Sequence, residues 1–304
     1  MNTTKKPQTI NNRIRERSRL GTWVLYFVAA VVAFITIYPM YYVLVLSLST
    51  PREALTMRVY WWPKGFFLGG YHRILVDPRL WRSYGNTVLY CSVRAVLNLL
   101  TSVLVAYPLT VRGLFGKKFV TMFLLIPMYV AGGIIPEFIL MTRLGLYNSP
   151  WALILPNCIS VFNVIVLRSF FYSVPDSLRE AAEIDGAGPI RTLVTVYLPL
   201  SLPSLATLAL FYAVGRWNGF SDALMYLKSS KAEKYWPIQL LLYNIIKNST
   251  QSSEIATQEG FFSAGVSKTI QMASVMFATV PILLVYPWLQ RYFVTGVTIG
   301  AVKG

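Results

Sequence analysis

Residues 23–48 read WVLYFVAAVVAFITIYPMYYVLVLSL and contain no charged side chain. An α-helix of about 20 apolar residues is long enough to cross the hydrocarbon core of a bilayer. The stretch is too long for the apolar segment of a secretory signal peptide, and no small-residue cleavage site closes it. We therefore interpret it as a first transmembrane helix, preceded by a basic cytoplasmic tail over residues 1–22.

Five further apolar stretches follow, and we expect each of them to be a transmembrane helix. The whole chain is 55% hydrophobic and only 13% charged, whereas soluble domains carry about 25% charged residues. The sequence therefore predicts an all-α, polytopic membrane protein with six transmembrane helices in a single membrane domain over residues 23–304. The five later helices are expected at roughly 86–109, 119–141, 151–172, 196–218 and 268–290.

The net charge of +16 would suit a nucleic-acid-binding protein, but its distribution does not. The basic residues lie at the ends of apolar stretches, where they meet lipid headgroups and set orientation. No zinc-ligand spacing or RNA-binding signature accompanies them, so we expect no nucleic-acid partner. Basic residues in the N-terminal tail and in a short loop predict that both are cytoplasmic: Lys5, Lys6, Arg13, Arg15, Arg17, Arg19, Arg112, Lys117 and Lys118.

Two long connecting segments, 49–83 and 219–267, would then lie outside the cell. Both are basic as well, but long loops cross the membrane largely regardless of charge. Segment 219–267 is polar and rich in Ser, Lys and Gln, so it is either a flexible connector or a partner-binding loop. An even number of crossings places the C-terminal tail, 291–304, in the cytoplasm.

The sequence offers no catalytic or metal-binding pattern. Cys91 and Cys158 lie inside apolar stretches, and His72 has no Cys or His partner nearby in the sequence. No nucleophile elbow or metal motif is present, and residues 113–118 lack the spacing and the hydroxyl of a phosphate-binding loop. We therefore expect a chain that is not an enzyme and binds neither metal nor nucleotide itself.

Residues 174–191 read VPDSLREAAEIDGAGPIR and separate the fourth and fifth predicted membrane helices. Pro175 blocks continuation of the preceding helix. Ser177 and Glu180 have the spacing of a capping box, which predicts the start of a new helix. Gly186 ends that helix, and a Gly-Pro step then starts a second short helix. The pattern predicts a helix–turn–helix on the cytoplasmic face of the membrane.

This element has the character of a docking surface. Small alanines permit close approach of another protein, and the charged residues around them orient it. An ordinary connector is the alternative, but a connector rarely needs two short helices, four charges and two placed glycines. We predict that the surface consists of Arg179, Glu180, Ala181, Ala182, Glu183, Asp185, Gly186 and Ala187.

The stretch EAAEIDGA at 180–187, followed by Leu198-Pro199, closely resembles the EAA motif of binding-protein-dependent ABC importer permeases. Val196 stands where the family pattern has Ile. The C-terminal residues 290–304, QRYFVTGVTIGAVKG, look like the ending of the MalG-like carbohydrate branch, and within it of the LplC/YtcP-like subgroup. The resemblance covers nearly the whole chain.

The resemblance implies a multi-pass subunit of a bacterial cytoplasmic membrane, with both termini in the cytoplasm. Its partners would be a second homologous permease, two ATPase subunits and an external solute-binding protein that delivers an oligosaccharide. The EAA coupling helix, in a loop at 174–195, would dock on an ATPase, and ATP and Mg would be bound there rather than by this chain. The sequence does not identify the sugar.

Polar residues inside the predicted helices are candidates for the transport pathway. Asn157, Ser160 and Asn163 recur every three residues, which predicts a polar stripe on one face of the fourth helix. Amides offer donors and acceptors to sugar hydroxyls, although helix–helix hydrogen bonding uses the same residues. Charged residues within the spans include Arg94, Glu137 and Arg168. From these, and from a Trp-Asn pair that recurs in the family, we add Glu137, Trp217 and Asn218 to the pathway candidates.

Two alternative functions remain at this stage. The same scaffold could carry a non-sugar solute, since fold does not fix substrate. A secondary transporter would work without ATP, but it predicts inverted repeats of broken helices, which the sequence does not display. The secondary-transporter reading also assigns no function to the loop at 174–195.

Overall fold

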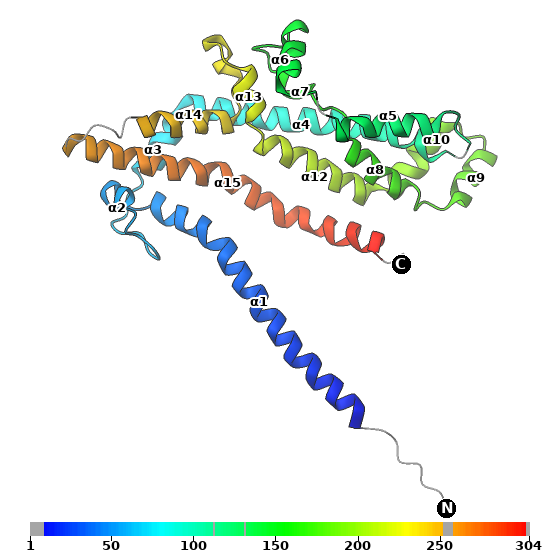
Figure 1. Cartoon of the computed structure of the whole chain (residues 1–304), viewed down its shortest axis with the longest axis horizontal. Coiled ribbons are helices and arrows are strands. Elements are labelled where there is room, and N and C mark those ends of the chain that lie inside the picture. Colours follow the sequence, from blue (N-terminus) through cyan, green and yellow to red (C-terminus); the bar gives the residue numbers. More distant parts are fainter. Residues whose placement is uncertain (1–8, 112, 131, 252–257, 302–304) are drawn as a thin grey trace, which may run out of the picture. The chain divides into compact units, whose positions relative to one another are not determined.

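The computed structural model describes residues 9–111, 113–130, 132–251 and 258–301, and the side chains of 21–111, 113–130, 132–248 and 264–287. Helices dominate this part of the chain, and one isolated antiparallel bridge pairs Ser49 with Phe66 (Figure 1). The predicted all-α class is confirmed. The side chains of the basic N-terminal tail, those of the C-terminal tail, and Arg112 lie outside the described residues.

The helices follow one another with short connections. Three elements depart from α-helix: 3-10 turns at Pro108–Thr110 and Ser230–Tyr235, and a π-helical turn at Leu193–Tyr197. The α-helices are α1 Thr9–Ser47, α2 Pro51–Thr56, α3 Gly69–Val76, α4 Pro78–Ala106, α5 Lys117–Tyr129, α6 Ile134–Arg143, α7 Trp151–Ile154, α8 Val161–Phe171, α9 Asp176–Ile184, α10 Pro189–Thr192, α11 Leu198–Leu200, α12 Leu202–Asn218, α13 Ser221–Tyr226, α14 Ile238–Gln251 and α15 Gln258–Ala301.

The chain forms two compact units. Unit 1 comprises the described parts of Met1–Tyr71 and Ser249–Met276, and unit 2 those of His72–Asn248 and Phe277–Gly304. In unit 1 the end of α1 packs on α2 through Val45, Leu46 and Ala54. A Cβ at Gly265 would lie 2.4 Å from the Pro51 carbonyl oxygen, so α15 can approach α2 this closely only at a glycine.

Unit 2 is built on α4, with α8 and α12 packed along it (Figure 1). Asp77 caps the start of α4 by accepting a hydrogen bond from the Arg79 N–H, and the Arg79 side-chain hydrogen bond lowers the pKa of this carboxyl. Farther along, the Ser102 and Tyr212 hydroxyls lie 2.6 Å apart and join α4 to α12. The buried core between these helices includes Val103, Ala106, Val164, Leu167, Leu205 and Leu208.

Three of the predicted membrane helices are found as single continuous spans. By length and composition, Gly21–Ser47, Pro78–Thr110 and Ala264–Pro287 can each cross a membrane. They correspond to the first, second and sixth predicted helices. With two bent helix pairs the number of candidate spans among the described residues rises to five, and α8 is a shorter apolar helix. The count of six therefore stays a prediction, as does the single membrane domain.

The third and fifth predicted helices are broken. Helix α5 ends at Tyr129 and α6 begins at Ile134, and Gly133, at φ +87°, directly precedes α6. In the fifth, the segment Pro189–Leu200 is bent by 83° against α12. Two prolines near the bend, Pro199 and Pro203, remove backbone donors that a continuous helix would use.

The fourth predicted helix, 151–172, is interrupted in the middle. Helix α7 ends at Ile154, and α8 begins only at Val161. Pro156 disfavours a helical continuation, and Asn157 adopts a left-handed φ of +56°. Asn157 and Ser160 therefore lie outside a regular helix, and the predicted polar stripe along one helical face is wrong.

Segment 219–267 is not a flexible connector over its described first part. It folds into α13, a 3-10 turn and α14, and hydrogen bonds join the 3-10 turn and the start of α14 to α4. Asn86 Nδ2 donates to the carbonyl oxygens of Lys234 and Trp236, at 2.8 and 3.1 Å. The Ile238 N–H donates to Thr87 Oγ1 at 2.8 Å. Residues 252–257 lie outside the described residues.

Candidate functional site

A short helix, α9, lies inside the predicted coupling loop. It begins at Asp176, and its N-cap residue is Pro175, which forms no side-chain cap hydrogen bond. Ser177 therefore lies within the first turn, and the predicted capping box is wrong. Asp176 in the first turn places a negative charge at the positive end of the helix dipole. The sequence predicts the position of this helix correctly, but it assigns the cap to the wrong residue.

Gly186 ends α9 as the sequence suggested. Its φ of +78° lies in the left-handed region, which costs other L-residues about 1–2 kcal/mol. The Gly186 N–H donates to the Glu183 carbonyl oxygen at 3.0 Å, and the Ala187 N–H donates to that of Ala182 at 2.9 Å. These two bonds close the helix C-terminus. A Cβ at Gly186 would meet nothing within 4 Å, so the surface there is open.

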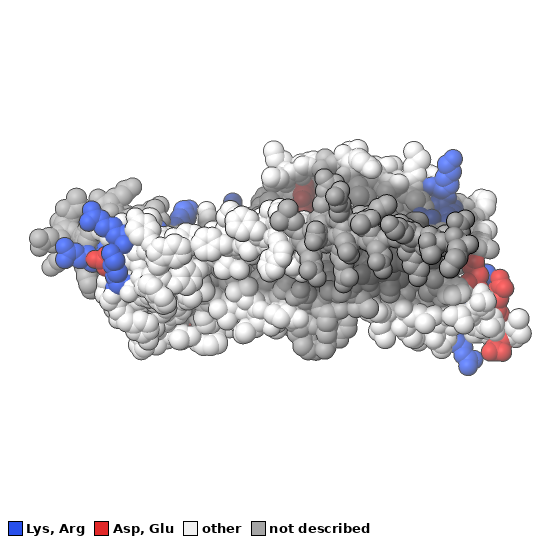
Figure 2. All heavy atoms as spheres, turned by 90° about the horizontal axis from the view of Figure 1, so that it is seen from below, with Lys and Arg blue, Asp and Glu red and all other residues white. Residues whose placement is uncertain are grey.

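The charges of α9 are organised around Arg179. Its guanidinium lies 2.6 Å from Glu183 and 3.9 Å from both Asp176 and Glu180. Arg179 is thus held by the acids of its own helix, and the exposed face is dominated by carboxylates, including that of Asp185. Figure 2 shows these acidic side chains gathered where α9 lies in unit 2.

Two exposed apolar side chains accompany the acidic face, and the sequence reasoning missed them. Ile184 is 86% exposed and Ile190 is 78% exposed. They lie on either side of the Gly186 turn. Large apolar side chains between charged neighbours are typical of a surface that another protein covers. Their signal in the sequence was two isoleucines in a polar loop, one on each side of Gly186.

Beneath α9 and α10 lies a cluster of aromatic rings. Tyr197, in the π-helical turn, contacts Tyr107 and Phe171 edge-on, with centroid distances of 5.1 and 5.6 Å. All three rings are buried. Tyr107 follows α4, Phe171 ends α8, and Tyr197 leads into α11 and α12. The predicted docking element is therefore fixed to the same three helices that form the core of unit 2.

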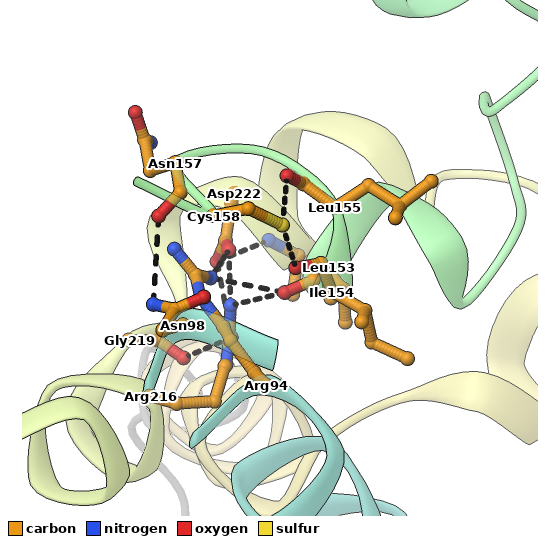
Figure 3. Close-up of polar contacts among 11 residues, drawn as sticks. Arg94, Asn98, Leu153, Ile154, Leu155, Asn157, Cys158, Arg216, Gly219 and Asp222 are labelled. Atoms are coloured by element: carbon orange, nitrogen blue, oxygen red, sulfur yellow. Dashed lines mark hydrogen bonds and ion pairs between the residues drawn. The ribbon is translucent and has the colours of Figure 1, made fainter. Parts of the chain in front are cut away.

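The same helices also line a polar pocket of about 450 Å³ (Figure 3). Asn157, Ser160 and Asn163, the three predicted pathway residues from one sequence stretch, all lie in its wall. Ser160 caps α8, and its Oγ accepts a hydrogen bond from the Asn163 N–H at 3.4 Å. The other lining residues are Arg94, Asn98, Phe211, Tyr212, Gly215, Arg216, Gly219, Ser221 and Asp222.

Arg216 is a buried residue in the wall of this pocket. Its guanidinium donates to both carboxylate oxygens of Asp222 and to the Gly219 carbonyl oxygen, the last at 2.7 Å. The Leu153 carbonyl oxygen lies 3.5 Å from the same guanidinium. The residue is 4% exposed. A buried arginine is stable only when its charge is paired and its donors are used, and here both conditions are met.

Arg94 and Asn98 enter the pocket from α4, one helical turn apart. Arg94 Nη1 donates to the Leu153 carbonyl oxygen at 2.9 Å and lies 3.8 Å from Asp222 Oδ2. Asn98 Nδ2 lies 3.5 Å from the Asn157 carbonyl oxygen, while its Oδ1 is buried without a hydrogen-bond partner among the described residues. Figure 3 shows both residues beside Asp222 and Arg216.

The remaining predicted pathway residues lie elsewhere. Glu137 is on α6 and exposed. Trp217 Nε1 donates to the Ala278 carbonyl oxygen at 3.2 Å, and its ring meets Tyr84 edge-on at 5.6 Å. Asn218 ends α12 and is exposed. None of these three lines the pocket, so their part in the pathway stays a prediction.

The sequence reasoning missed Arg216 and Asp222. The signal was present, since Arg216 lies inside the predicted fifth helix and an acid follows six residues later. Charged groups within a membrane segment almost always face the interior and pair with one another. Within the described residues, no three His, Cys, Asp or Glu side chains lie close enough together to hold a metal ion.

The chain is similar to known proteins. Residues 92–299 match the family described as "Binding-protein-dependent transport system inner membrane component". The chain is 36% identical to the polygalacturonan/rhamnogalacturonan transport system permease protein YtcP of Bacillus subtilis, covering 95% of this chain and 100% of the relative. It is 37% identical to protein LplC of the same organism, over 90% of this chain and 91% of that one.

A solved structure has the same fold. It is a bacterial ABC transporter involved in the import of the acidic polysaccharide alginate, with a TM-score of 0.80, 28% identity, and coverage of 96% of this chain and 100% of the other. The predicted resemblance to the carbohydrate branch and its LplC/YtcP-like subgroup is confirmed. This chain belongs to the family of binding-protein-dependent transport system inner membrane components.

Proposed function

We propose that this chain is the non-catalytic permease subunit of an ATP-driven importer and forms half of the membrane pathway for an oligosaccharide. A second permease would form the other half, and an external binding protein would deliver the sugar. Relatives named for polygalacturonan, rhamnogalacturonan and alginate favour a saccharide over another solute on the same scaffold. ATP and Mg would be bound by two partner ATPases rather than by this chain.

One observation carries this proposal: the docking element and the polar pocket share their helices. Helix α8 ends at Phe171, beneath α9, and begins beside Ser160 and Asn163, in the pocket wall. Helix α12 is joined through α11 to Tyr197 and carries Tyr212 in the pocket. Force applied at α9 would therefore reach the pocket through packed, rigid elements.

The bend between α11 and α12 would be the hinge of this connection. The π-helical turn at Leu193–Tyr197 and the 83° bend that follows depart from regular helix. Such departures often lie at functional sites and hinges. We propose that closure of the ATPases moves α9 and α10 and changes the pocket through this bend.

The assignment is tested by assembly and by stimulation. The chain should co-purify with a second permease and two ATPase copies, and the complex in liposomes should hydrolyse ATP faster when the loaded binding protein is added. A secondary transporter would purify without ATPases and would accumulate solute without ATP. The cytoplasmic position of both termini is tested separately, with reporter fusions at each end.

Asn157 provides a first test of the pocket as part of the pathway. It is exposed, and its backbone holds a left-handed φ of +56°, which glycine adopts without strain. The variant Asn157→Gly should therefore assemble normally, yet transport the saccharide about 3- to 10-fold more slowly, because one amide partner for a sugar hydroxyl is lost. Transport assays on complexes matched for ATPase content measure this. Unchanged transport would remove Asn157 from the pathway.

A further inference from the structure

The two arginines of the pocket are not equivalent. Arg216 is buried and donates hydrogen bonds to Asp222, Gly219 and Leu153, so the fold satisfies its charge and its donors. Arg94 donates one hydrogen bond among the described residues, to Leu153, although a guanidinium has a fork of several N–H donors. The nearest carboxylate oxygen, Asp222 Oδ2, is 3.8 Å away and already accepts from Arg216. Arg94 therefore keeps donors that the fold does not use.

The charges of the pocket do not balance. Among the described residues that line it, the charged ones are Arg94, Arg216 and Asp222, so two cations face one anion. Arg94 lies near the middle of the apolar span Pro78–Thr110. A charge at the centre of a membrane segment costs about 2.5–3.5 kcal/mol even on a lenient scale, and Arg94 shares its counter-ion, Asp222, with Arg216. A carboxylate on a ligand would neutralise the remaining positive charge.

Asn98 supplies a second, independent feature one turn along α4. The residue is 3% exposed and lines the pocket, and its Oδ1 is buried without a hydrogen-bond partner among the described residues. An unused buried acceptor is unfavourable, and a hydroxyl that reaches it restores a hydrogen bond. Residues four apart on a helix are neighbours on one face. A cationic guanidinium and an unused acceptor therefore lie on the same face of α4, in the wall of one pocket.

We propose that Arg94 and Asn98 form a subsite for one uronic acid residue of an acidic oligosaccharide. Arg94 pairs with the carboxylate, for which its planar fork is suited, and Asn98 Oδ1 accepts a ring hydroxyl. Asn157, Ser160 and Asn163 complete the polar wall around the same ring. The inference rests on the proposed importer function and adds to it the class of sugar and the residue that selects it.

The test compares an acidic probe with its uncharged methyl ester. The full complex, with its second permease, ATPases and binding protein, is reconstituted in liposomes. Uptake of trigalacturonate is measured beside uptake of its fully methyl-esterified form. For each probe, the uptake rate with the variant is divided by the uptake rate with the wild type. The binding protein's own preference between the two probes then cancels. Assembly is followed by co-purification of the ATPases.

Arg94→Gln should lower kcat/KM for the acid about 10- to 100-fold, the range for loss of a charge-assisted hydrogen bond. The ester should change by no more than about twofold, and Arg94→Lys should lie between Arg94→Gln and wild type for the acid. Arg82→Gln is the matched control, because Arg82 is an exposed arginine on the same helix and does not line the pocket. We expect both probes to stay within about twofold of wild type with that variant.

Asn98→Asp keeps the subsite testable if Arg94→Gln does not assemble. Its new carboxylate would pair with Arg94 and compete with the sugar, so uptake of the acid should fall selectively. Equal loss of both probes in an assembled variant, or loss of neither, overturns the uronate subsite. If the wild-type complex takes up the ester but not the acid, the uronate subsite is overturned and the importer function still stands. Uptake of neither probe, with no stimulation of ATP hydrolysis, overturns the importer function and the subsite together.

Discussion

Gly186→Leu is expected to abolish stimulation of ATP hydrolysis by the loaded binding protein, while the chain still reaches the membrane. A Cβ added at Gly186 would meet nothing within 4 Å, so the leucine side chain would start from an open surface at the end of α9. It would also be held at a left-handed φ of +78°, which costs about 1–2 kcal/mol locally. A bulky group at the proposed contact prevents close approach of the ATPase. The measurement is stimulated ATPase activity of the assembled complex in liposomes, and we expect a loss of more than about tenfold, equivalent to about 1.4 kcal/mol of coupling.

Gly145→Leu separates docking from backbone strain. Gly145 has a φ of +71°, and a Cβ there would likewise meet nothing within 4 Å. It follows α6, far along the sequence from the coupling loop. The local strain is therefore matched, and the proposed ATPase contact is untouched. Stimulation should survive in Gly145→Leu. If both variants lost it equally, strain rather than docking would explain the effect, and undiminished stimulation in Gly186→Leu would disprove the docking assignment.

Asp222→Asn is expected to have the largest effect on stability. The substitution leaves Arg216, which is 4% exposed, without its counter-ion, and it removes the carboxylate nearest to Arg94. The Arg216 side chain is 2% exposed and that of Asp222 is 30% exposed, so we expect a cost near the lower end of the range of about 3–5 kcal/mol for a buried ion pair, because the arginine charge stays buried and unpaired. We expect a clear fall in the unfolding temperature of the purified chain in detergent, together with lower yield of the assembled complex.

Two further variants show whether burial of the charge causes this loss. The exposed ion pair between Arg79 and Glu233, 3.7 Å apart, is the matched control, and Glu233→Gln should change the free energy of unfolding by less than about 1 kcal/mol. The double variant Arg216→Met, Asp222→Leu removes both charges and should recover part of the loss. An Asp222→Asn chain as stable as wild type would show that the pair does not support this part of unit 2.

The coupling loop and the pocket were predictable from the sequence to different degrees. The helix α9 and its end at Gly186 were predicted, because prolines and glycines act on the backbone locally and independently of the rest of the fold. Even here the cap was wrong: the helix begins beside Pro175, and Ser177 lies inside its first turn. The exposed Ile184 and Ile190 were missed, because exposure depends on what packs around a side chain.

The pathway residues were chosen for a reason that the structure does not support. The spacing predicts a polar stripe on a continuous helix, made of Asn157, Ser160 and Asn163. In the structure, Pro156 and the left-handed backbone of Asn157 interrupt that helix. The three polar residues meet in one pocket nevertheless, because Ser160 caps α8 and brings its two neighbours to the same wall. A regular spacing of polar residues could not distinguish these two arrangements.

The order of residues was enough to predict the membrane class, the first, second and last spans, the family and the position of α9. Each of these depends on local composition or on a short motif, as the uncharged stretch at 23–48 illustrates. The shared pocket of Arg94, Asn98, Arg216 and Asp222 became visible only in the folded chain. They come from α4, α12 and α13, and their proximity depends on how the core of unit 2 packs. The pairing of charges between distant segments is a property of that packing, and no local pattern specifies it.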